Sequence, residues 1–174
     1  MRIFTLLVAF AGIAGCSNLL PDGTDLRSKN ANNGNILSVG QIAPEFSLSD
    51  SDGNTVTLSQ ALAGKTGVII YFTMWCSICT AHSDEMLNSV MPAYGNVKFF
   101  LADYVSATPA EAGTMKNFSG YGSTAFTVLS DPAQQLMNSY GATMGFTVVI
   151  DSTKKIRLNE SYKRERIIAT LGAL

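Results

Sequence analysis

Charged residues are scarce in this 174-residue chain, and their signs nearly balance. Only 14% of the residues are Asp, Glu, Lys or Arg, and the formal net charge is −1. A basic surface for nucleic acid or for anionic lipid headgroups is therefore not expected. No internal repeat or heptad pattern is present. The hydrophobic content of 47% excludes a disordered chain, and the length fits one domain with a sizeable core.

Cysteine and histidine are also few, with three Cys and one His. Cys76 and Cys79 form a Cys-x-x-Cys pair, and no second pair exists to complete a four-ligand zinc site. Thr80 follows Cys79 where c-type haem attachment requires His. A redox-active pair and a purely structural disulfide remain. The redox interpretation is favoured because so short a disulfide loop contributes little entropic stabilisation.

The first fifteen residues have the features of a signal peptide. Arg2 gives a basic start, and the apolar run over 3–13 is too short to span a bilayer comfortably but has the length of a signal-peptide core. Ile13-Ala14-Gly15-Cys16 resembles the bacterial lipobox, which implies that Cys16 is lipidated and becomes the mature N-terminus. An ordinary secretory signal with an incidental Cys16, or a buried N-terminal strand, is the alternative.

Three segments follow from this interpretation. We expect a signal peptide over 1–15, a lipidated, flexible tether over 16–38 and a single globular domain over 39–174, because the tether is rich in Asn, Gly, Ser and Asp. By the sorting tendency of bacterial lipoproteins, Ser17 implies an outer-membrane protein of the cell envelope that faces the periplasm. Disulfides persist in such an exported setting.

The domain alternates strand and helix patterns. Residues 46–48 and 56–58 alternate around turn residues and predict a hairpin, while 68–72 and 97–104 predict buried central strands. A short strand is expected over 126–129. We expect helices over 76–89, from Pro109 onward, over 132–140 and over 164–174, and a terminal hairpin that pairs 146–150 with 155–158. Thr108 is the expected N-cap of the helix that begins at Pro109, with Glu111 as its capping-box acid. This alternation predicts an α/β domain whose sheet is covered on both faces.

The cysteine pair comes directly after the first buried strand, at the start of a predicted helix. Unpaired backbone N–H groups and the positive end of the helix dipole favour thiolate there, so we predict Cys76 as the attacking thiol. Cys79 lies three positions on, on the same helical face, where it can resolve a mixed disulfide. The redox-active disulfide Cys76–Cys79 then requires no organic cofactor or stable metal.

Several landmarks resemble the redoxin, or AhpC/TSA, branch of the thioredoxin superfamily. They are 39–48 with Asp52-Gly53-Asn54, the strand and turn over 68–79, Leu129-Ser130-Asp131-Pro132, and Val149-Ile150-Asp151. The similarity is strongest to TlpA-like and ResA-like membrane-tethered thiol–disulfide oxidoreductases. It implies a thioredoxin-like α/β fold, with a central mixed β-sheet, helices on both faces and an N-terminal β-hairpin. It also implies partners among exported proteins that bear thiols or disulfides, and a membrane redox partner.

The resemblance assigns supporting roles around the pair. From its position, Trp75 is expected to flank the disulfide and shape the substrate groove, with partial core packing as the alternative. His82 stands where several family members carry a proton-transferring glutamate, and a partly exposed surface histidine is the alternative. The family places a cis-proline in a substrate loop facing the cysteines. Counting back from Asp151 puts Phe146 at that place, within a loop comprising Met144, Gly145, Phe146 and Thr147. We expect a trans bond there, or a strained loop if cis, and Phe146 either caps the disulfide or packs within the loop.

Two rival functions use the same residues. Thr73 precedes Cys76 by three positions, as in the peroxiredoxin pattern Pro-x-x-x-Thr-x-x-Cys, although Ile69 stands where that pattern has proline. A peroxiredoxin-like thiol peroxidase is therefore one alternative. Cys76, Cys79 and His82 offer soft thiolates and imidazole for Cu(I), so a Sco-like copper-binding or delivery protein is the other.

Overall fold

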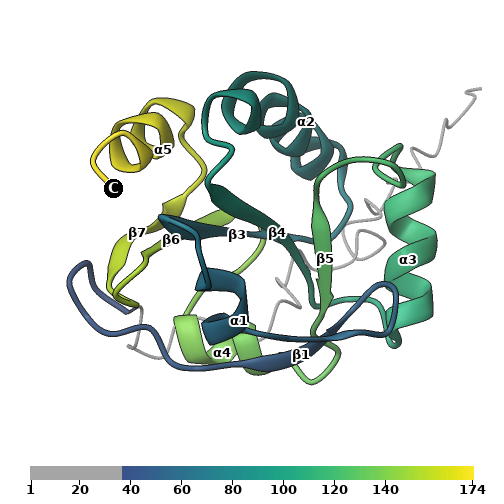
Figure 1. Cartoon of the computed structure of the whole chain (residues 1–174). Helices are drawn as coiled ribbons and strands as arrows, with labels where there is room; N and C mark the ends of the chain where they lie inside the picture. Colours follow the sequence, from purple (N-terminus) through teal and green to yellow (C-terminus); the bar gives the residue numbers. More distant parts are fainter. Residues whose placement is uncertain (1–36) are drawn as a thin grey trace, which may run out of the picture.

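The computed structural model describes residues 37–174, so the predicted signal peptide, Cys16 and nearly all of the predicted tether lie outside the described residues. A seven-stranded mixed sheet forms the centre of the domain (Figure 1). Its strands are β1 (Ser47–Asp50), β2 (Thr55–Thr57), β3 (Gly67–Thr73), β4 (Val97–Asp103), β5 (Thr127–Ser130), β6 (Phe146–Asp151) and β7 (Ile156–Ser161). The strand order is β2-β1-β5-β4-β3-β6-β7. β3, β4 and β5 run parallel, and the remaining pairs are antiparallel.

The helices cover both faces of this sheet, as expected (Figure 1). They are α1 (Leu58–Leu62), α2 (Ser77–Glu85), α3 (Pro109–Phe118), α4 (Gln135–Tyr140) and α5 (Arg164–Leu171). Residues of α2, α3 and α5 share one buried cluster, whereas residues of α1 and α4 share another on the opposite face. β1 and β2 form the predicted N-terminal hairpin, and β6 and β7 form the predicted C-terminal one.

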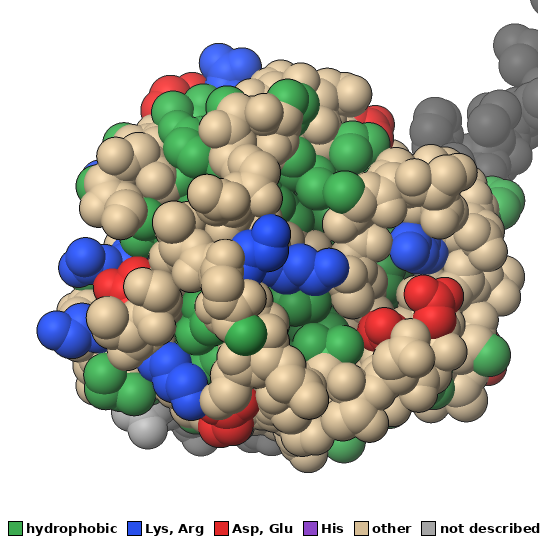
Figure 2. Space-filling model, viewed as in Figure 1, with side chains coloured by type: hydrophobic (Ala, Val, Ile, Leu, Met, Phe, Trp, Pro, Cys, Tyr) green, Lys and Arg blue, Asp and Glu red, His purple; other side chains and the backbone are tan. Residues whose placement is uncertain are grey.

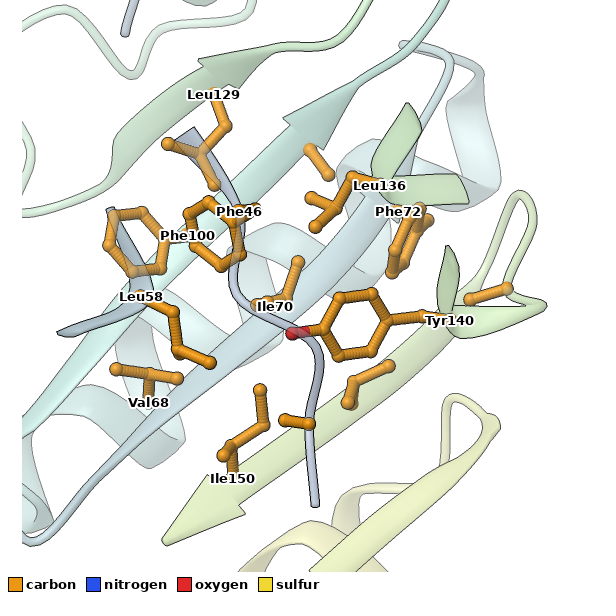
Figure 3. Close-up of a cluster of buried hydrophobic side chains, with 14 of the residues drawn as sticks. Phe46, Leu58, Val68, Ile70, Phe72, Phe100, Leu129, Leu136, Tyr140 and Ile150 are labelled. Atoms are coloured by element: carbon orange, nitrogen blue, oxygen red, sulfur yellow. The ribbon is translucent and has the colours of Figure 1, made fainter. Parts of the chain in front are cut away.

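The core depends on the alternation of side chains along β3, where all seven residues are buried. Ile70 and Phe72 point into the cluster under α1 and α4, where they pack among aromatic and aliphatic side chains (Figure 3). Ile69 and Tyr71 point the other way, into the cluster under α2, α3 and α5. A central strand that is apolar on both faces explains why the sequence over 68–72 shows no polar alternation.

Three helices differ from the expected boundaries, and one of them, α5, ends at Leu171 instead of residue 174. α4 begins three residues later than predicted, because the Asp131 carboxylate accepts hydrogen bonds from the backbone N–H groups of Gln135, Leu136 and Met137 at 2.7, 2.9 and 3.1 Å. The carboxylate thus satisfies the donors that open the helix. α2 ends at Glu85 and continues as a π-helical segment, Met86–Val90, and a short 3₁₀ turn, Met91–Ala93.

The N-terminus of α3 follows the expected capping chemistry. Thr108 Oγ1 accepts the N–H of Glu111 at 3.2 Å, and the Glu111 carboxylate accepts the N–H of Ala107 at 2.8 Å. Pro109 occupies the first helical position, where no intrahelical donor is needed.

Charge is spread thinly over the surface. On the face shown in Figure 2, basic and acidic side chains are interspersed with apolar ones and do not form a patch of one sign. This agrees with the nearly balanced composition. Among residues 37–174, no helix combines the length and apolar character needed to cross a bilayer.

Candidate active site

β3 delivers the cysteine pair to the start of α2. Cys76 is the N-cap residue of this helix, and its sulfur accepts the backbone N–H of Cys79 at 3.2 Å. Cys76 therefore lies at the helix N-terminus as predicted, one residue before the first helical residue, Ser77. Both cysteines are thiols in this structure. The N-cap geometry brings Cys79 one helical turn behind Cys76.

Exposure distinguishes the two sulfur-bearing residues. Cys79 is 1% exposed and belongs to the buried cluster under α2, whereas Cys76 is only half-buried and packs at the margin of that cluster. A large disulfide-bearing partner can therefore approach Cys76 but not Cys79. Cys76 is therefore the accessible outer cysteine of the pair, and Cys79 is the buried inner one.

The surroundings shift the pKa values of the two thiols in opposite directions. Burial and the adjacent Cys79 sulfur raise the pKa of Cys76, against backbone N–H hydrogen bonds that lower it. Burial opposes ionisation of Cys79 as well, but hydrogen bonds from the Cys76 thiol, from the Met74 and Cys76 backbone and from Thr73 lower its pKa. This differs from the expected thiolate preference of Cys76.

Trp75 bends the chain between strand and helix. Its φ of 59° lies in the left-handed region, which is uncommon for a bulky side chain and typical of functional turns. Two hydrogen bonds hold it there: Trp75 N–H donates to Thr73 Oγ1 at 3.1 Å, and the indole Nε1–H donates to Asp103 Oδ2 at 2.8 Å. Trp75 packs beside Cys76 at the edge of the cluster under α2, as expected for a flanking residue.

Asp103 is a site residue that the sequence analysis missed. It is fully buried at the end of β4, directly opposite Thr73 in the parallel register. Its second carboxylate oxygen accepts the N–H groups of Val105 and Ser106, both at 3.0 Å. An aspartate at the carboxyl end of a buried parallel strand was the available signal, because neighbouring strand ends meet at one edge of the sheet.

The predicted substrate loop contributes Met144, not Phe146, to the surroundings of Cys76. Met144 Sδ lies 3.7 Å from Cys76 Sγ. Phe146 packs in the cluster under α1 and α4, on the opposite face of the sheet, together with Val148. Of the two alternatives for Phe146, the ring therefore packs in the core and does not cap the disulfide. Side chains along β6 alternate, so Phe146 and Val148 share the face turned away from α2.

The rest of this loop is fixed by the backbone. Within the described residues every peptide bond is trans, including the bond before Phe146. Gly145 has a φ of 80°, its N–H donates to Phe72 O at 2.9 Å, and its carbonyl accepts the N–H of Tyr162 at 2.7 Å. The Thr147 side chain is fully buried. Of the four loop residues, Met144 therefore provides the side chain that contacts Cys76.

His82 sits one turn beyond Cys79 on α2, as its spacing predicted. Its Nδ1 is 2.9 Å from the Tyr71 hydroxyl, and its ring stacks on Tyr162 with centroids 4.1 Å apart. Burial lowers the pKa of His82, and the carboxylate of Glu85 partly offsets this. The imidazole is therefore neutral near pH 7.

The structure does not place His82 together with the two cysteines, as the copper alternative requires. Among residues 37–174, no three His, Cys, Asp or Glu side chains are placed to hold a metal ion together. Cys76, Cys79 and His82 therefore do not converge, and the His82 Nδ1 is directed at Tyr71. The sequence spacing was compatible with a shared site, but the helix brings the ring against the tyrosines.

Thr73, the residue behind the peroxidase alternative, interacts with the inner cysteine. Its hydroxyl hydrogen bonds to Cys79 and lowers the pKa of that thiol, and its Oγ1 accepts the Trp75 N–H. Thr73 is itself 1% exposed. The hydroxyl thus holds the turn that precedes Cys76.

Comparisons with known proteins agree with this geometry. The model of the AhpC/TSA family matches residues 39–159, and no curated protein matches. A Chlorobium tepidum protein described as a thiol:disulfide interchange protein, DsbE, is 26% identical with a TM-score of 0.63, and the match covers 78% of this chain and 99% of that one.

Two further solved structures share the fold. The thioredoxin domain of a thiol-disulfide oxidoreductase from Bacteroides vulgatus is 17% identical with a TM-score of 0.63, over 79% of this chain and 97% of that one. Peroxidoxin BcpB from Mycobacterium tuberculosis is 18% identical with a TM-score of 0.63, over 79% and 98%. The thioredoxin-like fold expected from the sequence is confirmed. The chain belongs to the AhpC/TSA family, in the redoxin branch of the thioredoxin superfamily, and is a thiol-dependent oxidoreductase.

Proposed function

We propose that this protein exchanges disulfides with partner proteins through Cys76 and Cys79. The observation that carries the proposal is the pairing of an accessible N-cap sulfur with a buried sulfur one turn behind it. The AhpC/TSA family match and the similarity to a thiol:disulfide interchange protein support it. No organic cofactor or stable metal takes part, and the redox-active group is the disulfide between these two residues.

The exchange proceeds in two displacements. Cys76 loses its proton to solvent and attacks a partner disulfide as the thiolate; a new bond forms between Cys76 and one partner sulfur, and the other partner sulfur leaves as thiolate. Cys79 then attacks the Cys76 sulfur, forms the intramolecular disulfide and releases the second partner thiolate. The partner disulfide gains two electrons, which the cysteine pair loses. The oxidised pair runs the same steps in reverse.

A partner protein would meet an apolar rim around Cys76. Met74, two residues before Cys76, is 36% exposed, and Ile78, two residues after it, is 52% exposed. Trp75 and Met144 complete this surface. We infer that extended, apolar segments around a partner cysteine dock here, with the flexible thioether of Met144 adapting to different sequences.

The protein acts in the cell envelope in this proposal. Cys16 carries lipid, the segment over 16–38 tethers the domain, and the domain faces the periplasm from the outer membrane. Its partners are exported proteins that bear thiols or disulfides, and a membrane redox partner restores the cysteine pair. Nucleic acid is not a partner, given a formal net charge of −1.

Trapping tests the exchange directly. In the full chain, Cys79→Ser removes the resolving sulfur, so mixed disulfides between Cys76 and partner proteins should accumulate and disappear on reduction. Cys76→Ser is the matched control, because it keeps the buried thiol and removes the accessible one. Equal trapping by both variants, or none by Cys79→Ser, would refute the proposal. Tight Cu(I) retention by an untrapped, reduced protein would instead favour metal delivery.

A thiol peroxidase is the second candidate, favoured by the AhpC/TSA family match and by the shared fold with a peroxidoxin. Peroxide would oxidise the Cys76 thiolate to sulfenic acid, and Cys79 would condense with it to the same disulfide, releasing water. Stopped-flow fluorescence of Trp75, the single tryptophan, with hydrogen peroxide separates the two candidates. We expect disulfide substrates to react faster, because Thr73 is engaged with Cys79.

A further inference from the structure

We propose that the reduced cysteine pair repairs Met144 after an oxidant has converted this methionine to its sulfoxide. Cys76 takes the oxygen from the sulfoxide, and Cys79 then closes the disulfide that completes the reaction. The substrate is a side chain of the protein itself, so this activity goes beyond disulfide exchange with partner proteins. It needs both thiols but no partner, and the two functions can therefore fail independently.

A contact between two sulfur atoms carries this inference. With both cysteines present as thiols, the Cys76 thiol donates a hydrogen bond to Met144 Sδ at 3.7 Å. Both residues are half-buried, so water and small oxidants reach them. The atom of Met144 that an oxidant attacks is therefore already in contact with the atom that can reverse the damage.

Backbone hydrogen bonds hold Met144 in this place. The N–H of Gly145, the next residue, donates to Phe72 O on the central strand β3 at 2.9 Å. The carbonyl of Gly145 accepts the N–H of Tyr162, which follows β7, at 2.7 Å. The loop is thus anchored to two other elements, and it cannot carry Met144 away from Cys76 without breaking these bonds.

Oxidation of Met144 would alter the surface around Cys76. The flexible, apolar thioether of Met144 packs against the same buried cluster as Trp75 and Cys76. Hydrogen peroxide or a hypohalous acid transfers one oxygen atom to the thioether sulfur, and the resulting sulfoxide is polar. The exchange site therefore carries an oxidisable side chain at its entrance, next to the thiol that can restore it.

The repair balances in two steps. The Cys76 thiolate attacks the sulfoxide sulfur, which gains two electrons and becomes the thioether again, while the oxygen passes to Cys76 as sulfenic acid with a proton from water. Cys79, whose N–H already binds Cys76 Sγ at 3.2 Å, then attacks the sulfenic sulfur; the disulfide forms and the oxygen leaves as water. In total, one sulfoxide and two thiols become one thioether, one disulfide and one water molecule.

Direct contact makes this reaction faster than reduction by a thiol in solution. A free thiol must first meet the sulfoxide and orient against it, whereas a group held in place acts with an effective concentration on the order of 10⁵ M or more. Met91 and Met115 provide internal references, because they are also half-buried but lie elsewhere, in the 3₁₀ turn after α2 and on α3. The rate advantage should be confined to Met144.

Peptide-resolved mass spectrometry of the full chain tests the repair. The cysteine pair is first closed as its disulfide, which protects both thiols, and hydrogen peroxide then converts accessible methionines to sulfoxides. After catalase has removed the peroxide, dithiothreitol reopens the pair in the absence of air, and acid-quenched samples report the sulfoxide at each methionine over time. The sulfoxide of Met144 should revert at least about a hundredfold faster than those of Met91 and Met115.

Variants locate the chemistry, with their remaining cysteine blocked as a methyl disulfide during oxidation. Cys76→Ser should leave the Met144 sulfoxide as long-lived as that of Met91, because the attacking sulfur is missing. In Cys79→Ser, unblocking with stoichiometric dithiothreitol should produce Cys76 sulfenic acid, which dimedone labels. Cys79→Ser/Met144→Leu is the matched control and should stay unlabelled, because its oxygen donor is missing. A folding defect would not transfer oxygen from Met144 to Cys76.

The outcomes separate the repair from the exchange. Equal lifetimes of the Met144, Met91 and Met115 sulfoxides in the wild-type chain would overturn the repair. Equal dimedone labelling of Cys79→Ser with and without Met144 would also overturn it. Neither result bears on exchange, which the trapping of partner proteins tests. Fast reversion of the Met144 sulfoxide that depends on Cys76, together with an empty trap, would support the repair and overturn the exchange function.

Discussion

The hydrogen bond between Trp75 and Asp103 should hold the cysteine turn in its left-handed conformation. Asp103→Asn keeps the shape of the side chain but replaces one acceptor oxygen by an NH₂ group. The carboxylate accepts three N–H groups, from Trp75, Val105 and Ser106, and all of them lie around a fully buried residue. In the variant, at least one of these donors must face another donor. A buried hydrogen bond to a charged group contributes about 1.5–3 kcal/mol, so the free energy of unfolding should fall by roughly this amount.

A double-mutant cycle isolates the indole contribution. Trp75→Phe removes the Nε1–H donor and keeps an aromatic ring at the same place. Urea unfolding followed by far-UV circular dichroism gives the free energies of both single variants and of the double variant. If Trp75 and Asp103 are coupled as the 2.8 Å distance indicates, the two losses should fall short of additivity by about 1–2 kcal/mol. Strict additivity would refute the reasoning, because it would mean that the carboxylate does not anchor the indole.

Three further predictions concern residues outside the reacting pair. Phe146→Ala should lower the free energy of unfolding by about 1–3 kcal/mol in urea titrations and leave the rate of exchange at Cys76 unchanged, because the ring packs on the far face of the sheet; a tenfold loss of exchange would restore the disulfide cap. Thr108→Ala should cost about 1 kcal/mol through loss of the α3 cap, while the exposed mid-helix Thr114→Ala should cost clearly less. Burial would raise the pKa of Asp151, but hydrogen bonds from Thr153 and Lys155 and the charge of Arg157 lower it. The ionised carboxylate therefore stabilises the fold above about pH 4, and this stabilisation is lost as the pH falls below that value. Asp151→Asn should make the urea midpoint less dependent on pH in the acid range, and an unchanged dependence would contradict this.

Patterns along single elements were sufficient for most of the fold. The continuous apolar run at 68–72 predicted the central strand, and turn residues at 50–54 predicted the N-terminal hairpin. Thr108 and Pro109 predicted the start of α3 to the residue. These signals are local, because caps, turns and buried runs are decided within a few residues. The start of α4 could not be predicted from such local signals. It depends on the Asp131 carboxylate, which accepts three N–H groups beyond Gln134, a residue in the left-handed conformation.

The order of the site residues along the chain could be predicted from the sequence, but their contacts with residues of other elements could not. The spacing of Cys76, Cys79 and His82 fixed their order on one helix, but the partners of each came from other elements. Tyr71 and Asp103 lie on two strands and read in the sequence as part of the buried core. Counting from Asp151 located the loop but not its inward side chain, because the backbone turn at Gly145 places Met144 against Cys76.

The pKa values of the two cysteines likewise depend on both the local sequence and the tertiary structure. A helix N-terminus favours thiolate at Cys76, and the N–H of Cys79 does bond to its sulfur. Burial and the second thiol raise the pKa of Cys76, whereas burial opposes ionisation of Cys79 but hydrogen bonds from the Cys76 thiol and from the Met74 backbone lower its pKa. Only the packed arrangement shows that access, more than charge, distinguishes the attacking sulfur.

Access can be measured directly by timed alkylation of the reduced, full-length chain. A short pulse of iodoacetamide at pH 7 followed by peptide-resolved mass spectrometry reports the labelling rate of each cysteine. If the outer sulfur begins the exchange and the inner one completes it, Cys76 should be modified at least about tenfold faster than Cys79. Comparable labelling of both residues, or faster labelling of Cys79, would contradict the division of roles on which the account depends.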